Sequence, residues 1–578
     1  MAYLKFDKFQ KGASLLATFL TAILLSDAPA LAQSASNLAP STFQPEALRP
    51  SSGPVTVARD PGASAPPGSE NLFVTIGGVD LQGALPQMAE ANAAFRQSLI
   101  GKQVAVARIF SATRRLETQY ADAGFVLARV VLPQQTLRDG GTLRIVVVDG
   151  FIESIDSSRV PEPVRNRVVS LTDPLIGKRG VRLRDIERAL LLAGDTYGVR
   201  LSSALKTGQA DGGTILVLDG KYKRLTGSYG FDNLLEDDLG TVNFNAGLEL
   251  NSALGLGETF YGRIGGAFQD YFSSDPRYRI FAAGAVVPIG TNGMTFNLEG
   301  TASRATPDVD FLPTNSEFDR LSFRLYYPWI RSRQFNLTSQ FILDRVWDEQ
   351  NFTPDGGTED PIYKDDLSVL RATLDGGWTL DSGAALQAGV IYSQGIDAFG
   401  ARADPEGDDT PLSRAGASAE FSKLVVTARY DVPFNTNWVL GVSGRAQTSF
   451  GDPLVSSEQM SVAGSGEMST FDAGTLRGDD GYVLRAEIGR QSRTAVRGFP
   501  LLIKPYLFGG YSRLGLEEPT VLEQSTTKAS AYGVGLEILT LEEDSFRSGS
   551  LRLEFGRGER DDDGPEGNRF GIVASRRF

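Results

Sequence analysis

The sequence predicts two small α+β modules near the N-terminus, followed by an antiparallel transmembrane β-barrel of about sixteen strands. Three observations support this fold class. A pattern of strand, helix, helix and strand occurs twice between residues 71 and 221. Residues 222–578 alternate apolar and polar side chains at period two and contain no long helical pattern. The 64 glycines, 33 phenylalanines and 17 tyrosines suit short, twisted strands better than helices.

Residues 1–32 have the pattern of a secretory signal peptide. A basic start precedes the apolar run 13–25, and Ala30-Leu31-Ala32 offers the small residues of a cleavage site. The run is too short to cross a bilayer as a helix. We therefore expect the mature chain to start near Gln33, with a membrane anchor as the alternative.

Residues 33–70 are rich in serine, proline and alanine. Such a segment buries too little apolar surface to offset the entropy lost on ordering it. We expect a linker or mobile arm, and the sequence leaves open whether this segment plugs the barrel.

Residues 71–150 form the first predicted module and residues 151–221 the second. Strands are expected at "NLFVTIGGVDL", "FVLARVVLP" and "TLRIVVVDG" in the first, and at "IESIDSS" and "GGTILVLDG" in the second. The stretch "GGTILVLDG" echoes "GGTLRIVVVDG" in the first module, which indicates two copies of one unit of roughly 70 residues. Helices are expected at residues 85–99, 104–123, 164–171 and 183–193.

Residues 222–578 are expected to form the barrel. Residues 242–250 place apolar side chains on one face and asparagine or glutamate on the other, and residues 295–303 repeat this pattern. A membrane-spanning strand needs about 9–11 residues, which these segments supply. At roughly 22 residues per strand with its loop, the region holds about sixteen strands. The terminal aromatic Phe578 also favours a barrel, and a soluble β-sandwich or propeller is the alternative.

The composition excludes several kinds of chemistry. The chain has no cysteine and no histidine, so disulfides, thiolates, Ser-His-Asp catalysis and histidine metal ligands are ruled out. A net charge of −13 argues against non-specific nucleic-acid binding. We expect no enzyme activity, no cofactor, no metal and no nucleic-acid partner. Carboxylate pairs are frequent, but charged groups on loops or an aqueous lumen are usually only solvated.

Three stretches, at residues 120–155, 183–199 and 227–258, resemble the transporters of two-partner (type V) secretion, the family of haemolysin activators and filamentous haemagglutinin exporters. The modules resemble POTRA domains. The resemblance implies a Gram-negative outer-membrane barrel with its POTRA domains in the periplasm. It implies that these domains capture an unfolded secreted partner, a large β-helical adhesin or cytolysin, and that the barrel passes it outward.

The same resemblance implies contacts with outer-membrane lipid and a need for the barrel assembly machinery during insertion. The residues expected to contact the client are Tyr120, Phe125, Leu132, Gln134 and Gln135. The alternative function is that of an assembly or insertion factor of the same superfamily. Modules that only orient the barrel, and a passive porin, are further alternatives.

The chain departs from this family at a loop motif. In the family, the arginine of a Val-Arg-Gly-Phe motif on the sixth extracellular loop pairs with an aspartate of the barrel wall. Residues 456–489 match that loop, but Met468, Ser469, Thr470 and Phe471 stand in place of the motif. On the strand expected to supply the aspartate, Phe508 is present but Gly510 occupies the aspartate position. We expect Phe471 to act as a packing anchor and Asp472 as a substitute polar one.

The tetrapeptide Val496-Arg497-Gly498-Phe499 does occur, but between the predicted strands 482–490 and 501–511. Strand polarity assigns that connection to the periplasmic end, opposite the sixth loop. We interpret the tetrapeptide as an ordinary turn, with a relocated loop motif as the alternative.

Overall fold

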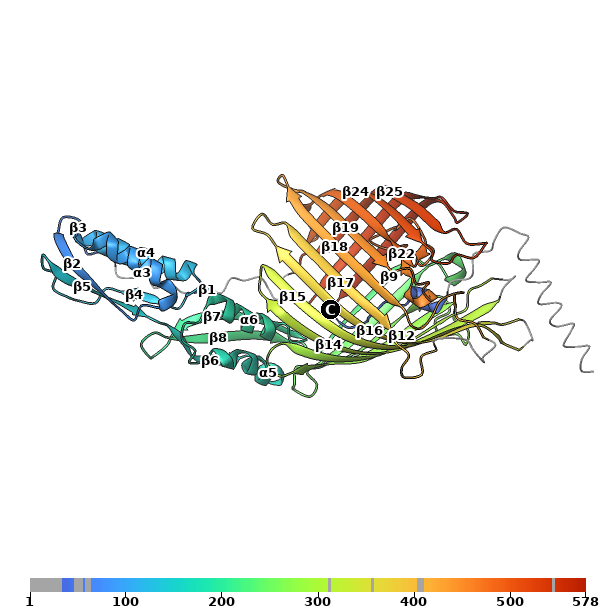
Figure 1. Ribbon diagram of the computed structural model, residues 1–578, viewed down its shortest axis with the longest axis horizontal. Coiled ribbons are helices and arrows are strands. Elements are labelled where there is room, and N and C mark those ends of the chain that lie inside the picture. Colours follow the sequence, from blue (N-terminus) through green and yellow to red (C-terminus); the bar gives the residue numbers. More distant parts are fainter. Residues whose placement is uncertain are drawn as a thin grey trace, which may run out of the picture.

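The computed structural model describes residues 34–45, 56–57, 64–309, 313–354, 358–402, 410–542 and 546–578. Two α+β modules precede a closed β-barrel, and they extend from one end of it (Figure 1). No described helix has the length and apolar character needed to cross a membrane. The predicted signal peptide, residues 1–32, lies outside the described residues.

The first module packs two helices on a sheet of order β3-β2-β5-β4, in which β2 and β5 are parallel. Its core includes Ile76, Leu116, Leu143 and Ile145. The short strand β3 was not predicted. The elements are β2 (Phe73–Gln82), η1 (Pro86–Met88), α3 (Ala89–Leu99), β3 (Gln103–Ala105), α4 (Val106–Asp122), β4 (Arg129–Val131) and β5 (Gly141–Val148).

The second module repeats this arrangement, with β6 parallel to β8 and β7 antiparallel to β8. Strand β7 was missed in the sequence because "VRLSSALKT" mixes apolar and polar residues without strict alternation. The outer edge of β7 pairs in parallel with β1 (Thr56–Val57), a segment that precedes both modules in the chain. The other elements are β6 (Phe151–Arg159), α5 (Glu162–Thr172), η2 (Asp173–Leu175), α6 (Leu183–Gly194), β7 (Val199–Thr207) and β8 (Gly213–Tyr222).

The described chain forms a closed antiparallel barrel of 16 strands, which confirms the predicted fold class. Strand β23 (Ser492–Val496) continues β22 beyond the wall and pairs with the start of β24. The wall strands are β9 (Leu225–Asp232), β10 (Asn243–Asn251), β11 (Thr259–Ala267), β12 (Tyr278–Ile289), β13 (Met294–Ala305), β14 (Thr314–Arg331), β15 (Phe335–Phe352), β16 (Asp360–Thr379), β17 (Ala385–Gly395), β18 (Ser422–Phe434), β19 (Trp438–Thr448), β22 (Asp480–Arg490), β24 (Phe499–Gly515), β25 (Thr526–Thr540), β26 (Ser548–Arg560) and β27 (Gly567–Arg577).

The period-two pattern places apolar side chains outside the barrel and polar ones inside. On β13, Leu298 is 40% exposed, whereas its neighbour Glu299 is fully buried. The wall closes where β27 pairs with β9, and Phe578 extends this seam because its amide N donates to Gly227 O at 3.0 Å. The Phe578 ring lies 6.3 Å from the Tyr229 ring, measured between centroids, on the outer face.

The second module is fixed to the mouth of the barrel through the turn after β14. Arg331 donates from Nε to Asp195 Oδ2 at 2.8 Å and from Nη2 to Asp195 Oδ1 at 2.7 Å. Arg188, on the helix α6 that ends just before Asp195, donates from Nη2 to Pro328 O at 2.8 Å. The turns of this end of the barrel therefore face the modules.

Two further segments lie inside the barrel. The arm, residues 34–45, carries the helical turn α2 (Ala35–Leu38), which contacts β13, β14 and the turn η4. The lumenal loop, residues 449–479, connects β19 to β22 and is folded back onto the inner wall. The loop contains η4 (Ser456–Glu458), β20 (Met460–Ser461) and β21 (Arg477–Gly478). Outside this loop, the short turn η3 (Asp237–Leu239) follows β9.

Candidate functional site

The arm is the segment of lowest residue number that the structure describes, and it occupies the lumen. The Ala35 amide N donates to Ser316 Oγ of β14 at 2.7 Å. Leu38 and Phe43 pack against an apolar cluster of the inner wall that includes Phe318 and Val346. A segment expected to be a linker or mobile arm is therefore seated, over residues 34–45, on the barrel wall.

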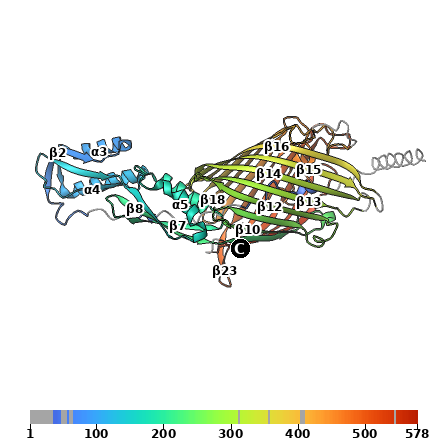
Figure 2. The same ribbon diagram turned by 90° about the horizontal axis from the view of Figure 1, so that it is seen from below.

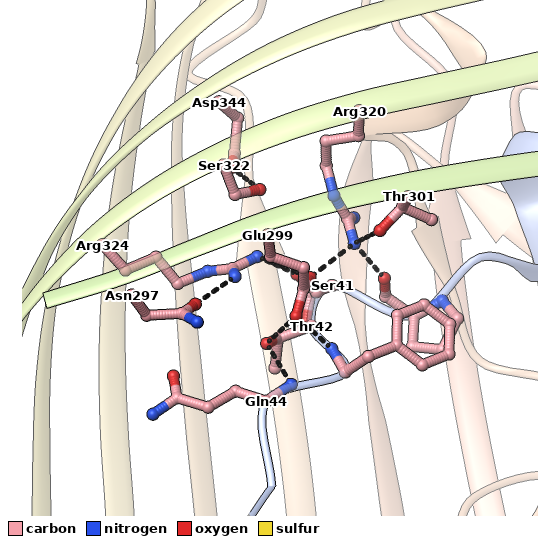
Figure 3. A network of polar contacts seen from close by, with 12 residues as sticks. Ser41, Thr42, Gln44, Asn297, Glu299, Thr301, Arg320, Ser322, Arg324 and Asp344 are labelled. Carbon is pink, nitrogen blue, oxygen red and sulfur yellow. Dashed lines mark hydrogen bonds and ion pairs between the residues drawn. The ribbon is translucent and has the colours of Figure 1, made fainter. Parts of the chain in front are cut away.

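Glu299 is the centre of the contacts between arm and wall (Figure 3). Its Oε2 accepts from the Phe43 amide N at 2.9 Å, from Thr42 Oγ1 at 3.3 Å and from the Tyr261 hydroxyl at 2.8 Å. Because Glu299 is fully buried, its charge requires cationic partners close by.

Two arginines of β14 provide those partners. In the barrel register Glu299 stands opposite Ser322, so Arg320 and Arg324 are its two diagonal neighbours. Arg324 Nη2 lies 3.2 Å and Arg320 Nη2 3.6 Å from Glu299 Oε1. The same Nη2 atoms donate to arm carbonyls, from Arg320 to Pro40 O at 2.8 Å and from Arg324 to Ser41 O at 3.0 Å (Figure 3).

The arm leaves this cluster toward the second module. Gln44 Nε2 donates to the Tyr197 hydroxyl at 3.3 Å, and that hydroxyl donates to Pro45 O at 3.1 Å. Burial raises the pKa of the Tyr197 hydroxyl to about 12, so this donor keeps its proton at any physiological pH.

A cavity of about 1040 Å³ runs beside the arm, from the second module into the lumen. Tyr197 and Asp195 line it on the module side, and Arg324, Arg371 and Glu458 line it inside the barrel. Most of the residues that line it have polar or charged side chains, as expected for a water-filled passage rather than a packed core.

The lumenal loop is anchored at η4 by an ion-pair network. Arg371 of β16 donates from Nη2 to Glu458 Oε1 at 2.6 Å and from Nε to Asp344 Oδ2 at 2.8 Å. Lys423 Nζ lies 2.6 Å from Glu458 Oε2. Burial alone would raise the pKa of the Glu458 carboxyl, but Arg371 and Lys423 outweigh it and lower that pKa to about 2.

The loop positions that carry Met468 and Ser469 instead of the family motif face the wall. Arg485 of β22 donates from Nη1 to Ser469 Oγ at 3.0 Å and to Glu467 O at 2.9 Å. The other end of the guanidinium pairs with Glu554 of β26, with 2.6 Å between Nη2 and Oε1. Ser469 Oγ also donates to Glu554. A buried Arg–carboxylate pair is thus present, with both charges on the wall.

The neighbouring loop positions also contact the barrel wall. Phe471 is buried, and its ring touches the position where a Gly558 side chain would lie. Asp472 pairs with Arg569 of β27. Burial raises the pKa of the Asp472 carboxyl, and Arg569 offsets part of that rise. Thr470 is also buried.

Gly510, the expected partner position, faces the loop, and a side chain there would crowd Met468. A Cβ at Gly510 would lie 3.2 Å from Met468 Sδ. Phe508 is buried beside it, and the Arg485 guanidinium lies 4.1 Å from the Phe508 ring centroid. Sequence reasoning sought the partner on β24 alone and so missed Arg485 and Glu554, which lie on β22 and β26.

The tetrapeptide at 496–499 lies at the tip of the β23–β24 hairpin, which projects from the module end of the barrel (Figure 2). Val496 pairs with Phe499, and both central residues have positive φ, 51° at Arg497 and 84° at Gly498. This is the backbone of a two-residue primed turn, for which glycine at the second position is favoured. Phe499 is 66% exposed, and nothing brings Arg497 near the lumen.

The first module corrects part of the expected client site. Tyr120 and Phe125 are buried in the module core, and the Tyr120 hydroxyl donates to Asn92 Oδ1 at 3.0 Å, so neither can contact a client. Leu132 packs partly against the same core. Gln134 is exposed. The side-chain amide of Gln135 donates from Nε2 to Arg144 O at 2.7 Å and accepts at Oε1 from Arg144 N at 2.9 Å, so it continues the pairing with β5 beyond the end of β4.

The outer edge of β4 has no strand partner among the described residues. The Val130 amide N, on that edge, donates to Glu117 Oε2 of α4 at 3.1 Å. The equivalent edge of the second module, that of β7, is covered by β1. The two modules thus differ in which edge is free for an added strand.

The site as a whole is a passage lined by many polar residues, in which residues 34–45 of the chain are seated. Within the described ranges no group of three or more acidic side chains is placed to hold a metal ion. Glu299 was placed on the polar face of its strand from the sequence, but its pairing with Arg320 and Arg324 needs the inter-strand register, which alternation alone does not reveal.

Comparisons with known proteins give a consistent result. The model for the haemolysin secretion/activation protein family ShlB/FhaC/HecB matches residues 212–529, and the model for the ShlB-type POTRA domain matches residues 74–150. An outer membrane transporter CdiB of Escherichia coli is 25% identical over 451 residues, which cover 76% of this chain and 72% of that relative.

Solved structures share the fold. CdiB from Escherichia coli superposes with a TM-score of 0.69 at 21% identity, covering 91% of this chain and 94% of that chain. BamA from Haemophilus ducreyi lacking POTRA domains 1–3 superposes with a TM-score of 0.51 at 10% identity, covering 88% of this chain and 100% of that chain.

Proposed function

The chain belongs to the haemolysin secretion/activation protein family, and from this premise we propose that it exports an unfolded secreted partner through its barrel. Members of this family are two-partner secretion transporters of the outer membrane, with POTRA domains in the periplasm. The proposal for this chain is that its POTRA domains bind the partner as an extended strand before it enters the lumen.

The observation that carries this proposal is the open edge of β4 in the first module. An extended chain can add to such an edge, where main-chain hydrogen bonds supply the affinity without requiring a folded surface. The outward Val130 amide is held only by the Glu117 carboxylate, so an incoming strand would exchange one hydrogen bond for another. This suits a client that must remain unfolded.

The second module supports the next step of the route. It is fixed to the barrel mouth by Arg331 and Asp195, beside the 1040 Å³ cavity that continues into the lumen. A client leaving the first module would therefore meet the passage directly. The sequence contains no phosphate-binding loop of the form G-x-x-x-x-G-K followed by serine or threonine, so we infer that folding of the client outside the cell drives transport.

Cysteine crosslinking tests capture, because the native chain has no cysteine. The client would be the product of a neighbouring gene for a large repetitive secreted protein, carrying single cysteines in its N-terminal region. Val131→Cys, on the open edge, should form crosslinks to it during export. Gln103→Cys on β3, at the opposite edge of the same sheet, is the matched control and should form none. Equal crosslinking at both positions would reject capture at β4.

The alternative is an assembly factor that inserts other barrels into the membrane. The similarity to BamA concerns the fold alone. Deleting residues 74–150 while the barrel keeps its heat-modifiable migration separates the two functions. The export proposal expects loss of the secreted client with normal levels of other outer-membrane proteins, and a general loss of outer-membrane proteins would favour assembly instead.

A further inference from the structure

We propose that Glu299, Arg320 and Arg324 form a main-chain clamp, a lumenal site that binds any extended polypeptide by its backbone. At rest the clamp holds residues 40–43 of the arm, and during export a client segment takes their place. The inference rests on the proposed export function for the identity of the second occupant.

The atoms that the clamp contacts are almost all backbone atoms. Arg320 and Arg324 bind the carbonyls of Pro40 and Ser41, and Glu299 accepts from the Phe43 amide at 2.9 Å. Among the described residues, the one side-chain hydrogen bond from the arm to the clamp is from Thr42 Oγ1 to Glu299, at 3.3 Å. Every residue except proline offers both an N–H and a C=O, so this pattern of two acceptors and one donor fits many sequences.

The wall side of the clamp is built to be rigid. Glu299 also accepts from Tyr261, and Arg324 Nη1 donates to Asn297 Oδ1 at 2.8 Å. All three charged side chains are less than 8% exposed. Hydrogen bonds to charged groups in such surroundings are stronger than those between neutral groups.

The clamp also has an unused donor. Arg320 Nε is buried and has no hydrogen-bond partner among the described residues. Buried polar groups are rarely left unsatisfied, so an occupant that places a carbonyl against this donor would gain a hydrogen bond that the arm does not make. A client backbone that is shifted along the clamp by one residue, relative to the arm, can supply this carbonyl.

Main-chain contacts occur at two further points, one made by the arm and one by β1. The Tyr197 hydroxyl donates to Pro45 O at 3.1 Å, and β1 pairs in parallel with β7 opposite Ala204 and Leu205. Residues 40–45 thus lie between Tyr197 of the second module and the clamp, where an extended client would also pass. An occupant held mainly by its backbone can be exchanged for another chain of different sequence.

A conductance experiment tests the clamp without the client. The variant lacking residues 34–45, checked for heat-modifiable migration, is inserted in a planar bilayer, and peptides are added on the module side. The probes are the arm peptide SASNLAPSTFQP, a scrambled peptide of the same composition, and the arm peptide N-methylated at the phenylalanine. We expect the first two to block current within about threefold of one another and the methylated one to be about tenfold weaker.

Point variants assign the block to the clamp. Glu299→Gln and Arg324→Gln should weaken block by both unmodified peptides about tenfold. Glu249→Gln, which alters another lumenal carboxylate that is paired with Arg263 and does not touch the arm, should leave it unchanged. In the otherwise intact chain, Glu299→Gln should raise the resting conductance and Glu249→Gln should not, a readout that does not need the deletion.

The outcomes separate this inference from the export proposal. If only the unscrambled arm peptide blocks, the site recognises the arm by its side chains and the clamp is wrong, even where export is demonstrated. If both peptides block and Glu299→Gln abolishes the effect, the clamp stands as a polypeptide site whether or not the predicted client is exported.

Discussion

Ser469 Oγ of the lumenal loop lies 3.0 Å from Arg485 Nη1 of strand β22. In the family pattern the arginine sits on the loop and its carboxylate on the wall. Here the wall carries both Arg485 and Glu554, and the loop contributes a hydroxyl and the Glu467 carbonyl. The Arg–carboxylate pair is therefore kept while the arginine has changed its place.

Because the arginine lies on the wall in this chain, we predict that an additional arginine on the lumenal loop is not tolerated. Ser469→Arg alone should reduce export several-fold, because it would add a third guanidinium to Arg485 and Arg552, which already share Glu554 and Glu487 in a buried site. Adding Arg485→Ser should restore most of the export, since the cluster then again holds two guanidiniums for Glu487 and Glu554. Export of the client and heat-modifiable migration are the measurements. Gly510→Asp should not rescue Ser469→Arg, because an aspartate at this position would crowd Met468 Sδ. Rescue by Gly510→Asp would show that the loop sits differently.

Because Arg497 lies in an exposed turn, we predict that substitutions there have little effect on export. Arg497→Ala should leave export within about twofold of the native level, because the residue is at an exposed hairpin tip. Arg497→Asn should be equally silent for export and slightly favourable for the hairpin, since asparagine tolerates positive φ better than arginine does. Quantifying secreted client from both variants checks this. A loss of export with Arg497→Ala would make the tetrapeptide a working motif after all.

The sequence predicted the fold well where one physical signal dominates. Alternation gave the strands β10 and β13, and the repeat gave both modules, because burial on one face imposes a period. The prediction failed at β7, because its sequence does not alternate regularly. It also failed at Tyr120 and Phe125, because the sequence does not distinguish an apolar side chain that points into the core from one that is exposed at a strand edge. The partners of Ser469 and Glu299 depend on inter-strand register, which a single sequence does not encode locally.

The pKa of Glu458 predicts a loop that stays anchored over a wide pH range. A carboxyl whose folded pKa is lowered to about 2 contributes stability that is fully present above its ordinary value of 4.5 and is lost as the pH falls toward 2. Protease sensitivity of the lumenal loop should therefore be constant between about pH 5 and 8. Glu458→Gln should raise that sensitivity at neutral pH, whereas Glu420→Gln, an exposed carboxylate between β17 and β18, should not.

The arm predicts a reversible block of export. The Ala35 amide N lies 2.7 Å from Ser316 Oγ, so cysteines at these two positions are close enough to test for a disulfide. Oxidised Ala35→Cys/Ser316→Cys should keep the arm in the lumen and prevent export, because residues 40–43 could not leave Glu299 and the arginines. A reductant should restore export to near the native level, and each single-cysteine variant should export normally under both conditions. The bond is scored by the altered migration of the unreduced protein, and undiminished export from the fully crosslinked variant would mean that the client passes with the arm in place.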